Sequence, residues 1–317
     1  MNPLASLYGA VTGFRNRLYD RGTLKTHRLQ GPVVSIGNLA VGGSGKTPFL
    51  IALGELLQQR GVAFDVLSRG YGRATKGVAL VDPEGSPRDF GDEPLLIARR
   101  LRVPVIVGED RYAAGQFAEQ KFGPQLHLLD DGFQHRRLAR DFDMVLVTST
   151  DVRDSLLPAG RLREPLSSIA RADAIVLTND TPADGLPLAK QRVWHVARSI
   201  VASRLNERCF AFCGIARPEN FFAELASCGV ALAGQRAFSD HHVYTKADVR
   251  RLQELRQQHN AAAFLTTEKD AINLGQLISE LQPLHIATVC MELREPEAAL
   301  DLLLSRTARN LTPHETI

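Results

Sequence analysis

The sequence predicts an α/β protein with a mostly parallel sheet, helices on both faces of that sheet, and a second, smaller α/β unit. After residue 30, short apolar runs rich in β-branched residues alternate with longer runs at helical spacing. This alternation is typical of a parallel sheet built from strand–helix repeats. The chain has 317 residues, of which 44% are hydrophobic and 23% charged. Such a composition is ordinary for a globular protein of one large or two smaller domains.

The first series of predicted elements ends near residue 178. Its strands cover 32–37, 64–69, 78–81, 103–107, 125–130, 143–148 and 173–178, and its helices begin near residues 46, 92, 112 and 165. Residues 178–187 then have loop chemistry, because Pro, Gly, Asn and Asp recur there. We expect a domain boundary in this loop.

The second series follows the loop. Its predicted strands lie near 192–197, 209–213, 230–237, 262–266 and 285–289, and its predicted helices near 218–227, 246–258 and 296–305. The expected division is therefore an N-terminal helix within 1–30, a core domain at 31–180, a smaller C-terminal α/β domain or lid at 181–305, and a tail at 306–317.

The N-terminal segment has the pattern of a basic amphipathic helix. Its apolar side chains fall on one helical face, and basic residues follow closely: Leu4, Leu7, Tyr8, Val11, Phe14 and Leu18, then Arg15, Arg17, Arg21, Lys25 and Arg28. A helix of this kind lies in a membrane interface. The alternative is a helix packed on the protein through the same apolar face. Residues 1–14 are uncharged, but they are too few to span a bilayer.

Residues 37–48 are the most informative stretch of the chain. They form a glycine-rich turn that follows a β-branched run, ends in Gly-Lys-Thr and leads into a helix. Such a turn binds phosphate through backbone amides and the helix N-terminus, while the lysine reaches the β- and γ-phosphates and the threonine ligates Mg²⁺. The candidate nucleotide-binding residues are Gly42, Gly43, Ser44, Gly45, Lys46 and Thr47. With them, the predicted fold is P-loop NTPase-like.

One position departs from the usual P-loop pattern. The first glycine of that pattern is replaced by Ala40, although Gly42 and Gly43 can supply the flexibility instead. The alternative interpretation is a chance glycine-rich turn whose lysine is merely solvated.

Two consecutive aspartates end the predicted strand 125–130. Asp130 and Asp131 are followed by a glycine, and P-loop proteins place a carboxylate beside Mg²⁺ in this way. We expect one of them to meet the metal directly or through water, and the other to orient Lys46 or Thr47. The alternative is a surface turn, since Asp-Gly is a common turn dipeptide.

Asp92 opens a predicted helix, and the motif Ser68–Arg73 ends another strand at the same expected edge of the sheet. Ligands of open α/β sheets collect at this edge, where a carboxylate can accept the proton of an attacking hydroxyl. The residue pattern alone favours a simpler role for Asp92, which is capping its helix.

Further polar side chains follow other strands. Several charged residues lie in predicted loops: Arg111, Arg161, Arg163 and Glu164. The arginines suit a phosphate clamp, and the alternative is ordinary surface ion pairing. His241 and His242 stand beside Asp240. Adjacent histidines in an extended segment point to opposite faces, so one of them is expected to pair with a carboxylate, with capping or packing as the alternative. The segment Thr266–Ala271 adds a cation to the cleft or caps a helix.

Composition excludes other classes of protein. The net charge is only +3 and no basic, aromatic-rich platform occurs, which disfavours nucleic-acid binding. The four cysteines form no CxxC pair, so neither a zinc site nor a disulfide framework is indicated. A reducing cytosolic setting is the simpler interpretation.

Taken together, these segments resemble the tetraacyldisaccharide 4'-kinase family. The matching motifs occur in order and run from the N-terminal helix to about residue 295: 36–38, 42–48, 68–72, 91–94, 130–135, 158–165, 240–242 and 267–270. Their combination is more specific than any single motif. The family is not strict at the position of Ala40.

The resemblance implies a kinase that uses ATP and Mg²⁺ to phosphorylate the 4'-hydroxyl of a tetraacylated glucosamine disaccharide 1-phosphate in lipid A biosynthesis. It also implies a peripheral protein on the cytoplasmic face of the bacterial inner membrane. By position, Lys46, Asp92 and Arg163 are implied to be catalytic, together with His241 or His242. Further implied roles are metal binding by Thr47, Asp130 and Asp131, cofactor binding by Arg111 and Glu164, and substrate contact by Asn38 and Tyr71.

Two other classes of function stay open from the residues alone. One is a P-loop kinase of a soluble metabolite with a purely structural N-terminal helix. The other is a nucleotide-dependent switch or assembly NTPase that phosphorylates no acceptor. Dependence of activity on a membrane or detergent tests the first alternative, and dependence of ATP consumption on an acceptor alcohol tests the second.

Overall fold

The computed structural model describes residues 3–178, 181–202, 205 and 207–308. The strands in chain order are β1 (Val33–Asn38), β2 (Phe64–Ser68), β3 (Ala79–Leu80), β4 (Val105–Val107), β5 (Leu126–Asp130), β6 (Phe142–Val147), β7 (Ala174–Thr178), β8 (Arg192–Val201), β9 (Cys209–Cys213), β10 (Leu232–Ala237), β11 (Ala263–Thr267) and β12 (Leu284–Leu293). The α-helices are α1 (Pro3–Asp20), α2 (Lys46–Gln59), α3 (Pro87–Phe90), α4 (Asp92–Leu101), α5 (Arg111–Phe122), α6 (Pro218–Ser227), α7 (Lys246–Gln258), α8 (Glu268–Leu274) and α9 (Pro296–Thr307).

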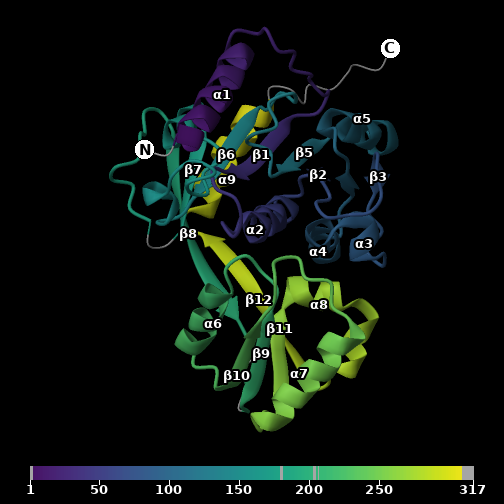
Figure 1. Cartoon of the computed structure of the whole chain (residues 1–317). Coiled ribbons are helices and arrows are strands. Elements are labelled where there is room, and N and C mark those ends of the chain that lie inside the picture. Colours follow the sequence, from purple (N-terminus) through teal and green to yellow (C-terminus); the bar gives the residue numbers. More distant parts are fainter. Residues whose placement is uncertain (1–2, 179–180, 203–204, 206, 309–317) are drawn as a thin grey trace.

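The described strands form one sheet in the order β10-β9-β11-β12-β8-β7-β6-β1-β5-β2-β4-β3 (Figure 1). The described pairs are parallel apart from β3 with β4 and β8 with β12. The predicted fold class, a mostly parallel α/β sheet, is confirmed.

Helices cover both faces of the sheet, as predicted. Successive strand residues point to opposite faces, and β1 shows the consequence. Val34 packs in a core cluster with Leu50 of α2, whereas its neighbour Val33 packs in another cluster with Ala114 of α5. The strands around β1 are therefore buried on both sides, which is why they read as continuous apolar runs.

The second unit is smaller and has the same layered construction. β9, β10 and β11 lie between α6, which packs in one core cluster through Phe221, and α7, which packs in another through Leu252. β8 and β12 connect this unit to the first, because β8 pairs with β7 over its first half and with β12 over its second (Figure 1).

The last helix returns to the first unit. α9 packs against α2 and β6, with Leu300 and Leu303 in the core cluster that contains α2. The expected domain boundary near residue 180 stays a proposal. We propose that the core domain also includes the first half of β8 and the helix α9, which follow this boundary in the sequence. Residues 179–180 of the expected boundary lie outside the described residues, as do residues 309–317 of the expected tail.

Local differences from the predicted elements are few. The helix expected near residue 165 is a 3₁₀ helix at Leu166–Arg171, because β7 begins soon after it and leaves no room for a longer helix. The short helix α3 was not predicted. No helix among the described residues combines the length and apolar composition that crossing a membrane requires.

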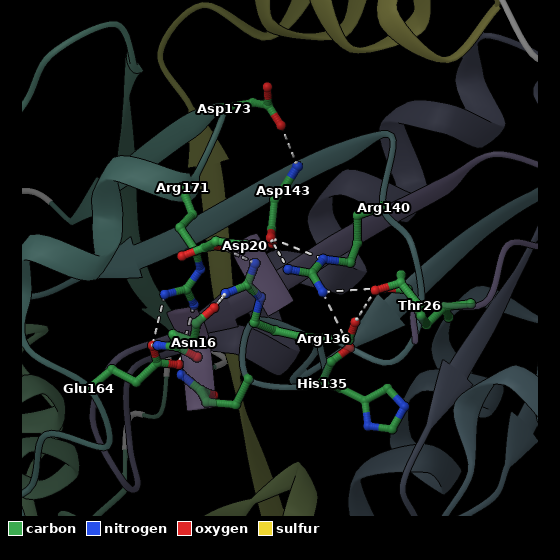
Figure 2. Close-up of polar contacts among 12 residues, drawn as sticks. Asn16, Asp20, Thr26, His135, Arg136, Arg140, Asp143, Glu164, Arg171 and Asp173 are labelled. Atoms are coloured by element: carbon green, nitrogen blue, oxygen red, sulfur yellow. Dashed lines mark hydrogen bonds and ion pairs between the residues drawn. The ribbon is translucent and has the colours of Figure 1, made fainter. Parts of the chain in front are cut away.

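The helix α1 packs on the first unit through its polar residues. The buried Asn16 donates to the Glu164 carboxylate at 2.6 Å, and Arg136 donates to the Asn16 carbonyl at 2.9 Å and to Asp20 at 2.7 Å (Figure 2). The Tyr8 hydroxyl donates to the Arg163 carbonyl at 3.1 Å. Leu4, Leu7, Val11 and Phe14 are exposed, so the predicted alternative, in which α1 packs on the protein through this apolar face, does not hold for these four side chains.

A buried charged triad lies at the opposite edge of the sheet from the carboxyl end of β1. The His127 ring contacts Asp65 at 2.8 Å and Glu119 at 3.4 Å, and both His127 and Asp65 are fully buried. Burial alone would lower the pKa of His127, but the hydrogen bonds to the two carboxylates outweigh it and raise the pKa to about 9. The imidazolium therefore holds β2, β5 and α5 together.

We expect stability to fall as the pH rises through about 9. The folded-state pKa of His127 lies above the unfolded value, so the stabilisation is complete below about pH 6.5 and is lost as the folded ring deprotonates.

A His127→Leu variant should lose about 3–5 kcal/mol of unfolding free energy at pH 7, because Asp65 is left buried without its partner. Urea unfolding at pH 7 and pH 10 measures both effects, and an equal alkaline loss in both proteins would contradict the assignment to His127.

Candidate active site

The glycine-rich turn lies between the end of β1 at Asn38 and the start of α2 at Lys46. Gly42, Gly43 and Gly45 have positive φ angles of 77°, 52° and 82°, a conformation that glycine adopts without steric cost. A Cβ atom at Gly45 would lie 2.3 Å from Cε of Met291. The turn therefore requires glycine for both its backbone conformation and its close packing.

The departure from the motif at Ala40 has a structural explanation. Ala40 forms an antiparallel bridge with Leu162, flanked by hydrogen bonds from the Val41 amide to the Arg161 carbonyl at 2.8 Å and from the Arg163 amide to the Leu39 carbonyl at 2.7 Å. Ala40 does not adopt a positive φ angle, so an alanine is compatible with this position.

Asn38 organises the turn from within. Its side-chain amide donates to the Ala40 carbonyl at 2.8 Å and to Oγ of Ser44 at 2.7 Å. Its side-chain oxygen accepts from Nζ of Lys46 at 3.1 Å. Asn38 was predicted to contact substrate, and in the structure it is fully buried and holds the turn and the lysine.

Asp131 pairs with the two cations of the turn region. Its carboxylate lies 3.5 Å from Nζ of Lys46 and accepts two hydrogen bonds from Arg163, at 2.8 and 2.9 Å. Burial opposes ionisation of this carboxyl, but the Lys46 and Arg163 charges outweigh it and hold its pKa well below the usual range. Lys46 and Asp131, which the prediction requires on the same side of the molecule, are in contact.

Asp130 precedes Asp131 in the chain, but the pKa of its carboxyl is shifted in the opposite direction. It is buried, one oxygen accepts from Oγ of Ser68 at 2.8 Å, and the other has no hydrogen-bond partner. Burial and the nearby carboxylates of Glu93 and Asp131 raise the pKa of Asp130 to about 7. A buried carboxylate with a free oxygen is stabilised by a cation, so Asp130 fits a metal-facing role.

A metal at this position needs few protein ligands. Among the described residues, no group of three or more His, Cys, Asp or Glu side chains is arranged to hold a metal ion. Mg²⁺ at nucleotide sites is commonly held by one or two carboxylates together with phosphates and water. The unpartnered oxygen of Asp130 and the hydroxyl of Thr47, the second residue of α2, fit that pattern.

A second polar cluster is built around Asp92. Gly91 occupies the cap position of α4 and Asp92 is the first helical residue. One Asp92 oxygen accepts from the Glu93 amide at 2.8 Å, so the side chain does satisfy an amide of the first turn, as the capping interpretation expects, but it also has partners outside the helix. The Asp92 carboxylate contacts Nδ1 of His241 at 2.9 Å and accepts from Nδ2 of Asn273 at 3.1 Å. Burial raises its pKa, but His241 and the Lys269 charge outweigh burial, so the pKa of Asp92 is lowered.

His241 is held between a carboxylate and an ammonium group. Its Nδ1 faces Asp92, and its Nε2 lies 3.2 Å from Nζ of Lys269. The Asp92 hydrogen bond raises the pKa of His241, against burial and the Lys269 charge. The predicted substrate residue Tyr71 lies over this ring at 5.3 Å between centroids and is itself exposed.

His242 belongs to a different environment. Its ring stacks on Phe238 at 4.6 Å and contacts Asp248 of α7 at 3.3 Å. Of the two predicted histidines, the structure therefore brings His241 to Asp92 and places His242 in a packing role. Backbone geometry separates them, because His241 has a positive φ of 55° and the chain turns at that residue.

Arg163 and Glu164 also point in opposite directions. Arg163 reaches Asp131, whereas the fully buried Glu164 contacts Asn16 of α1 at 2.6 Å and Arg171 at 2.8 Å (Figure 2). The structure therefore does not bring Glu164 to the turn, although it was predicted to bind cofactor.

Arg111 lies near the two aspartates. It is buried at the start of α5, and its guanidinium donates to the Glu109 carbonyl at 2.9 Å. Burial and the Arg69 charge lower the pKa of Arg111, while Asp130 and Asp131 act against this effect. Its predicted place at the strand ends therefore agrees with the structure.

Two residues of the site were not predicted. Glu93 lies 3.6 Å from Lys269 and also acts electrostatically on Asp130, so it connects the two clusters. Asn273 donates to Asp92 from α8. The sequence could have indicated Asn273 in one way. It follows Lys269 by four residues, which places both side chains on one face of the helix.

The fold and these two clusters define a P-loop-type, phosphate-binding α/β protein. The family model described as tetraacyldisaccharide-1-P 4'-kinase, LpxK, matches residues 1–308. The chain belongs to this family, and the resemblance inferred from the motifs is confirmed.

Relatives support the same assignment over nearly the whole length. A tetraacyldisaccharide 4'-kinase of Koribacter versatilis is 49% identical over 314 residues, covering 96% of this chain and 98% of that protein. A tetraacyldisaccharide 4'-kinase of Aquifex aeolicus is 39% identical over 291 residues, covering 86% and 88%. The crystal structure of LpxK from Aquifex aeolicus in complex with ATP has a TM-score of 0.79 at 34% identity, covering 96% and 98%.

Proposed function

We propose that this protein transfers the γ-phosphoryl group of ATP to the 4'-hydroxyl of a tetraacylated glucosamine disaccharide 1-phosphate, in lipid A biosynthesis. The proposal rests on one observation: the polar cluster around Asp92 lies close to the cluster that contains Lys46 and the two aspartates. The helix α4, which begins with Asp92, packs against α2, which begins with Lys46. Glu93 lies 3.6 Å from Lys269, and its charge also acts on Asp130, so the Asp92–His241 pair and the turn with Lys46 lie at the same edge of the sheet. A phosphate donor and an acceptor hydroxyl can thus meet at one edge of the sheet.

Asp92 is the proposed acceptor-side residue. Its lowered pKa keeps it ionised at neutral pH and makes it a weak base. It therefore accepts a hydrogen bond from the attacking hydroxyl and holds that oxygen in line, and it takes the proton as the new bond forms. His241 is a positioning residue. The ionised Asp92 carboxylate can only accept, so Nδ1 of His241 carries the proton of their hydrogen bond and holds the carboxylate in place.

Lys46 and Arg163 are the proposed donor-side cations. Both are held by Asp131 and by Asn38, so they are oriented before the phosphates arrive and need little reorganisation. Mg²⁺, when bound, neutralises charge on the phosphates, and Thr47 and Asp130 would hold it, with Asp131 alongside.

We further propose that α1 rests on the cytoplasmic face of the inner membrane. Four of its large apolar side chains are about 60% exposed, at spacings of three and four residues: Leu4 63%, Leu7 62%, Val11 60% and Phe14 62%. The polar contacts that fix α1 on the protein leave this stripe facing outward. Such a stripe suits a lipid surface and a lipid acceptor, which favours this substrate over a soluble metabolite.

Polar substitutions in the stripe should release the protein from membranes. We expect a Leu7→Asn, Val11→Asn double variant to shift from the vesicle-bound to the free fraction in sedimentation with anionic vesicles. Each lost apolar side chain removes roughly 1.5–3 kcal/mol of burial. A matched control is Val243→Asn, which changes a side chain 77% exposed on the second unit. Equal partitioning of wild type and double variant would contradict the membrane role of α1.

The transfer itself is tested with a labelled nucleotide. Purified protein is incubated with γ-labelled ATP, Mg²⁺ and the tetraacyldisaccharide 1-phosphate in detergent, and the label is located by mass spectrometry of the lipid. We expect label at the 4'-position and little ATP consumption without acceptor. ATP consumption that is independent of acceptor would instead support the switch or assembly NTPase.

A further inference from the structure

We infer that Arg217 of the second unit binds the polyphosphate of the nucleotide, opposite the turn that carries Lys46. This inference rests on the proposed function in that it takes a nucleoside triphosphate as the ligand of the turn. Arg217 is absent from the motifs by which the sequence indicates the site. It lies between β9 and α6, at the cap position of α6.

The Arg217 side chain lies directly on the glycine-rich turn. A Cβ atom built at Gly43 would be 3.3 Å from Cγ and Cδ of Arg217 and 3.4 Å from its Nε, and one built at Gly42 would be 3.2 Å from Cβ of Ala216. The loop between β9 and α6 therefore rests against the part of the turn in which the glycines have positive φ angles. A side chain from one unit thus reaches the phosphate-binding element of the other.

The guanidinium of Arg217 is incompletely satisfied. Nη1 donates to Oγ1 of Thr150 at 3.1 Å, whereas Nε and Nη2 are buried and have no hydrogen-bond partner. Buried N–H groups of a charged side chain are costly to leave unpaired. They call for an acceptor, and an anion is the best one because guanidinium forms its strongest hydrogen bonds with carboxylate and phosphate.

A second arginine converges on the same point. Nη2 of Arg161 lies 3.5 Å from the Thr150 hydroxyl, so two guanidinium groups share one neutral oxygen. Of the nearby carboxylates, Asp154 accepts from Nε of Arg161 at 3.0 Å, and one oxygen of Asp151 accepts from Oγ1 of Thr148 at 2.7 Å. The other oxygen of Asp151 is buried without a hydrogen-bond partner in the described part of the chain, and it forms no hydrogen bond with Arg217. Among the described residues, no carboxylate forms an ion pair with Arg217.

This arrangement identifies the class of ligand. Two cations meet at an uncharged hydroxyl, beside a turn whose amides and lysine are suited to phosphate. Burial and the Arg161 charge lower the pKa of Arg217 and outweigh the opposing charges of the nearby carboxylates, Asp151, Glu219 and Asp154. An anion with several acceptor oxygens satisfies the unpaired N–H groups and relieves the repulsion between the arginines. A triphosphate on the turn supplies such oxygens, and an arginine from the second unit then makes binding depend on how the two units meet.

The test compares an Arg217→Gln variant with wild type and with Arg250→Gln, which changes an exposed arginine on α7. Isothermal titration calorimetry gives Kd for ATP and for AMP in the presence of Mg²⁺. We expect Arg217→Gln to weaken ATP binding about 10- to 100-fold, the effect of losing hydrogen bonds to a charged group. AMP binding should change much less, and Arg250→Gln should change neither value. An ATP Kd within twofold of wild type would overturn the inference.

A Thr150→Val variant separates ligand binding from a structural latch. It removes the hydroxyl that Arg217 contacts, while it leaves the two unpaired N–H groups in place. If Arg217 binds phosphate, Thr150→Val should keep the ATP Kd within about threefold. An equal loss in Thr150→Val and Arg217→Gln would show a latch and overturn the inference. Thermal unfolding of each variant shows whether a loss reflects misfolding.

The result is distinguishable from failure of the proposed function. A wild-type protein that phosphorylates the lipid while Arg217→Gln binds ATP normally refutes only the role of Arg217. A wild-type protein that transfers no phosphoryl group, yet loses ATP affinity when Arg217 is replaced, refutes only the kinase reaction.

Discussion

Replacement of Asp92 by asparagine is expected to lower kcat on the order of 10²–10³-fold while the Kd for ATP stays within about twofold of wild type. Asparagine keeps the shape of the side chain, but it removes the charge that orients and deprotonates the acceptor hydroxyl. Asp92 contacts His241, Asn273 and Lys269 rather than the glycine-rich turn, so nucleotide binding should not depend on it. Steady-state kinetics and calorimetry with ATP measure the two quantities.

A matched control and an epistasis test sharpen this prediction. Asp184→Asn changes an exposed aspartate in the loop before β8 and should leave kcat unchanged. His241→Ala should lower kcat less than Asp92→Asn, and the double variant should match Asp92→Asn alone, because His241 acts only through Asp92. Additive losses would contradict a positioning role, and an unchanged kcat in Asp92→Asn would return Asp92 to a structural role at the start of α4.

The strand-end motifs could be predicted because each is local in sequence. Lys46 and Asp131 follow β1 and β5, which are adjacent and parallel, so the rule that ligands gather at the carboxyl edge of such a sheet brought them together correctly. The residue pattern also placed Asp92 at this edge, although it favoured a capping role, and the catalytic role came from the family resemblance. Periodicity was sufficient to locate the strands, whereas their order in the sheet was not predicted.

Side-chain direction could not be predicted in the same way. Glu164 follows Arg163 directly yet faces α1, and His242 follows His241 yet stacks on Phe238. Which neighbour enters the site is decided by the backbone at one residue, such as the positive φ of His241. Arg217 illustrates a further limit, since its contact with Gly43 depends on how two units pack, and that packing has no local signal in the sequence.

Replacement of Lys46 by alanine is expected to have the broadest effect of any single change at the site. Lys46 lies 3.5 Å from Asp131 and donates to Asn38, so its ammonium is already oriented where the turn meets the two aspartates. Its removal takes away a charge that stabilises both bound phosphates and the transferring group. We expect kcat/KM to fall on the order of 10²–10³-fold, with weaker ATP binding as well, which distinguishes this variant from Asp92→Asn.

Arg163, the remaining cation beside Asp131, should not compensate for the lost charge of Lys46. In Lys46→Ala, Asp131 keeps its two hydrogen bonds to Arg163, so the fold of the turn is expected to persist and thermal unfolding should change little. Lys46→Arg should recover little activity, because a planar guanidinium cannot replace a compact ammonium group in a confined turn. Lys190→Ala, at an exposed lysine, is the matched control. If Lys46→Ala retained wild-type ATP affinity and turnover, phosphate would have to bind elsewhere than at this turn, and both the proposed reaction and the role of Arg217 would fail with it.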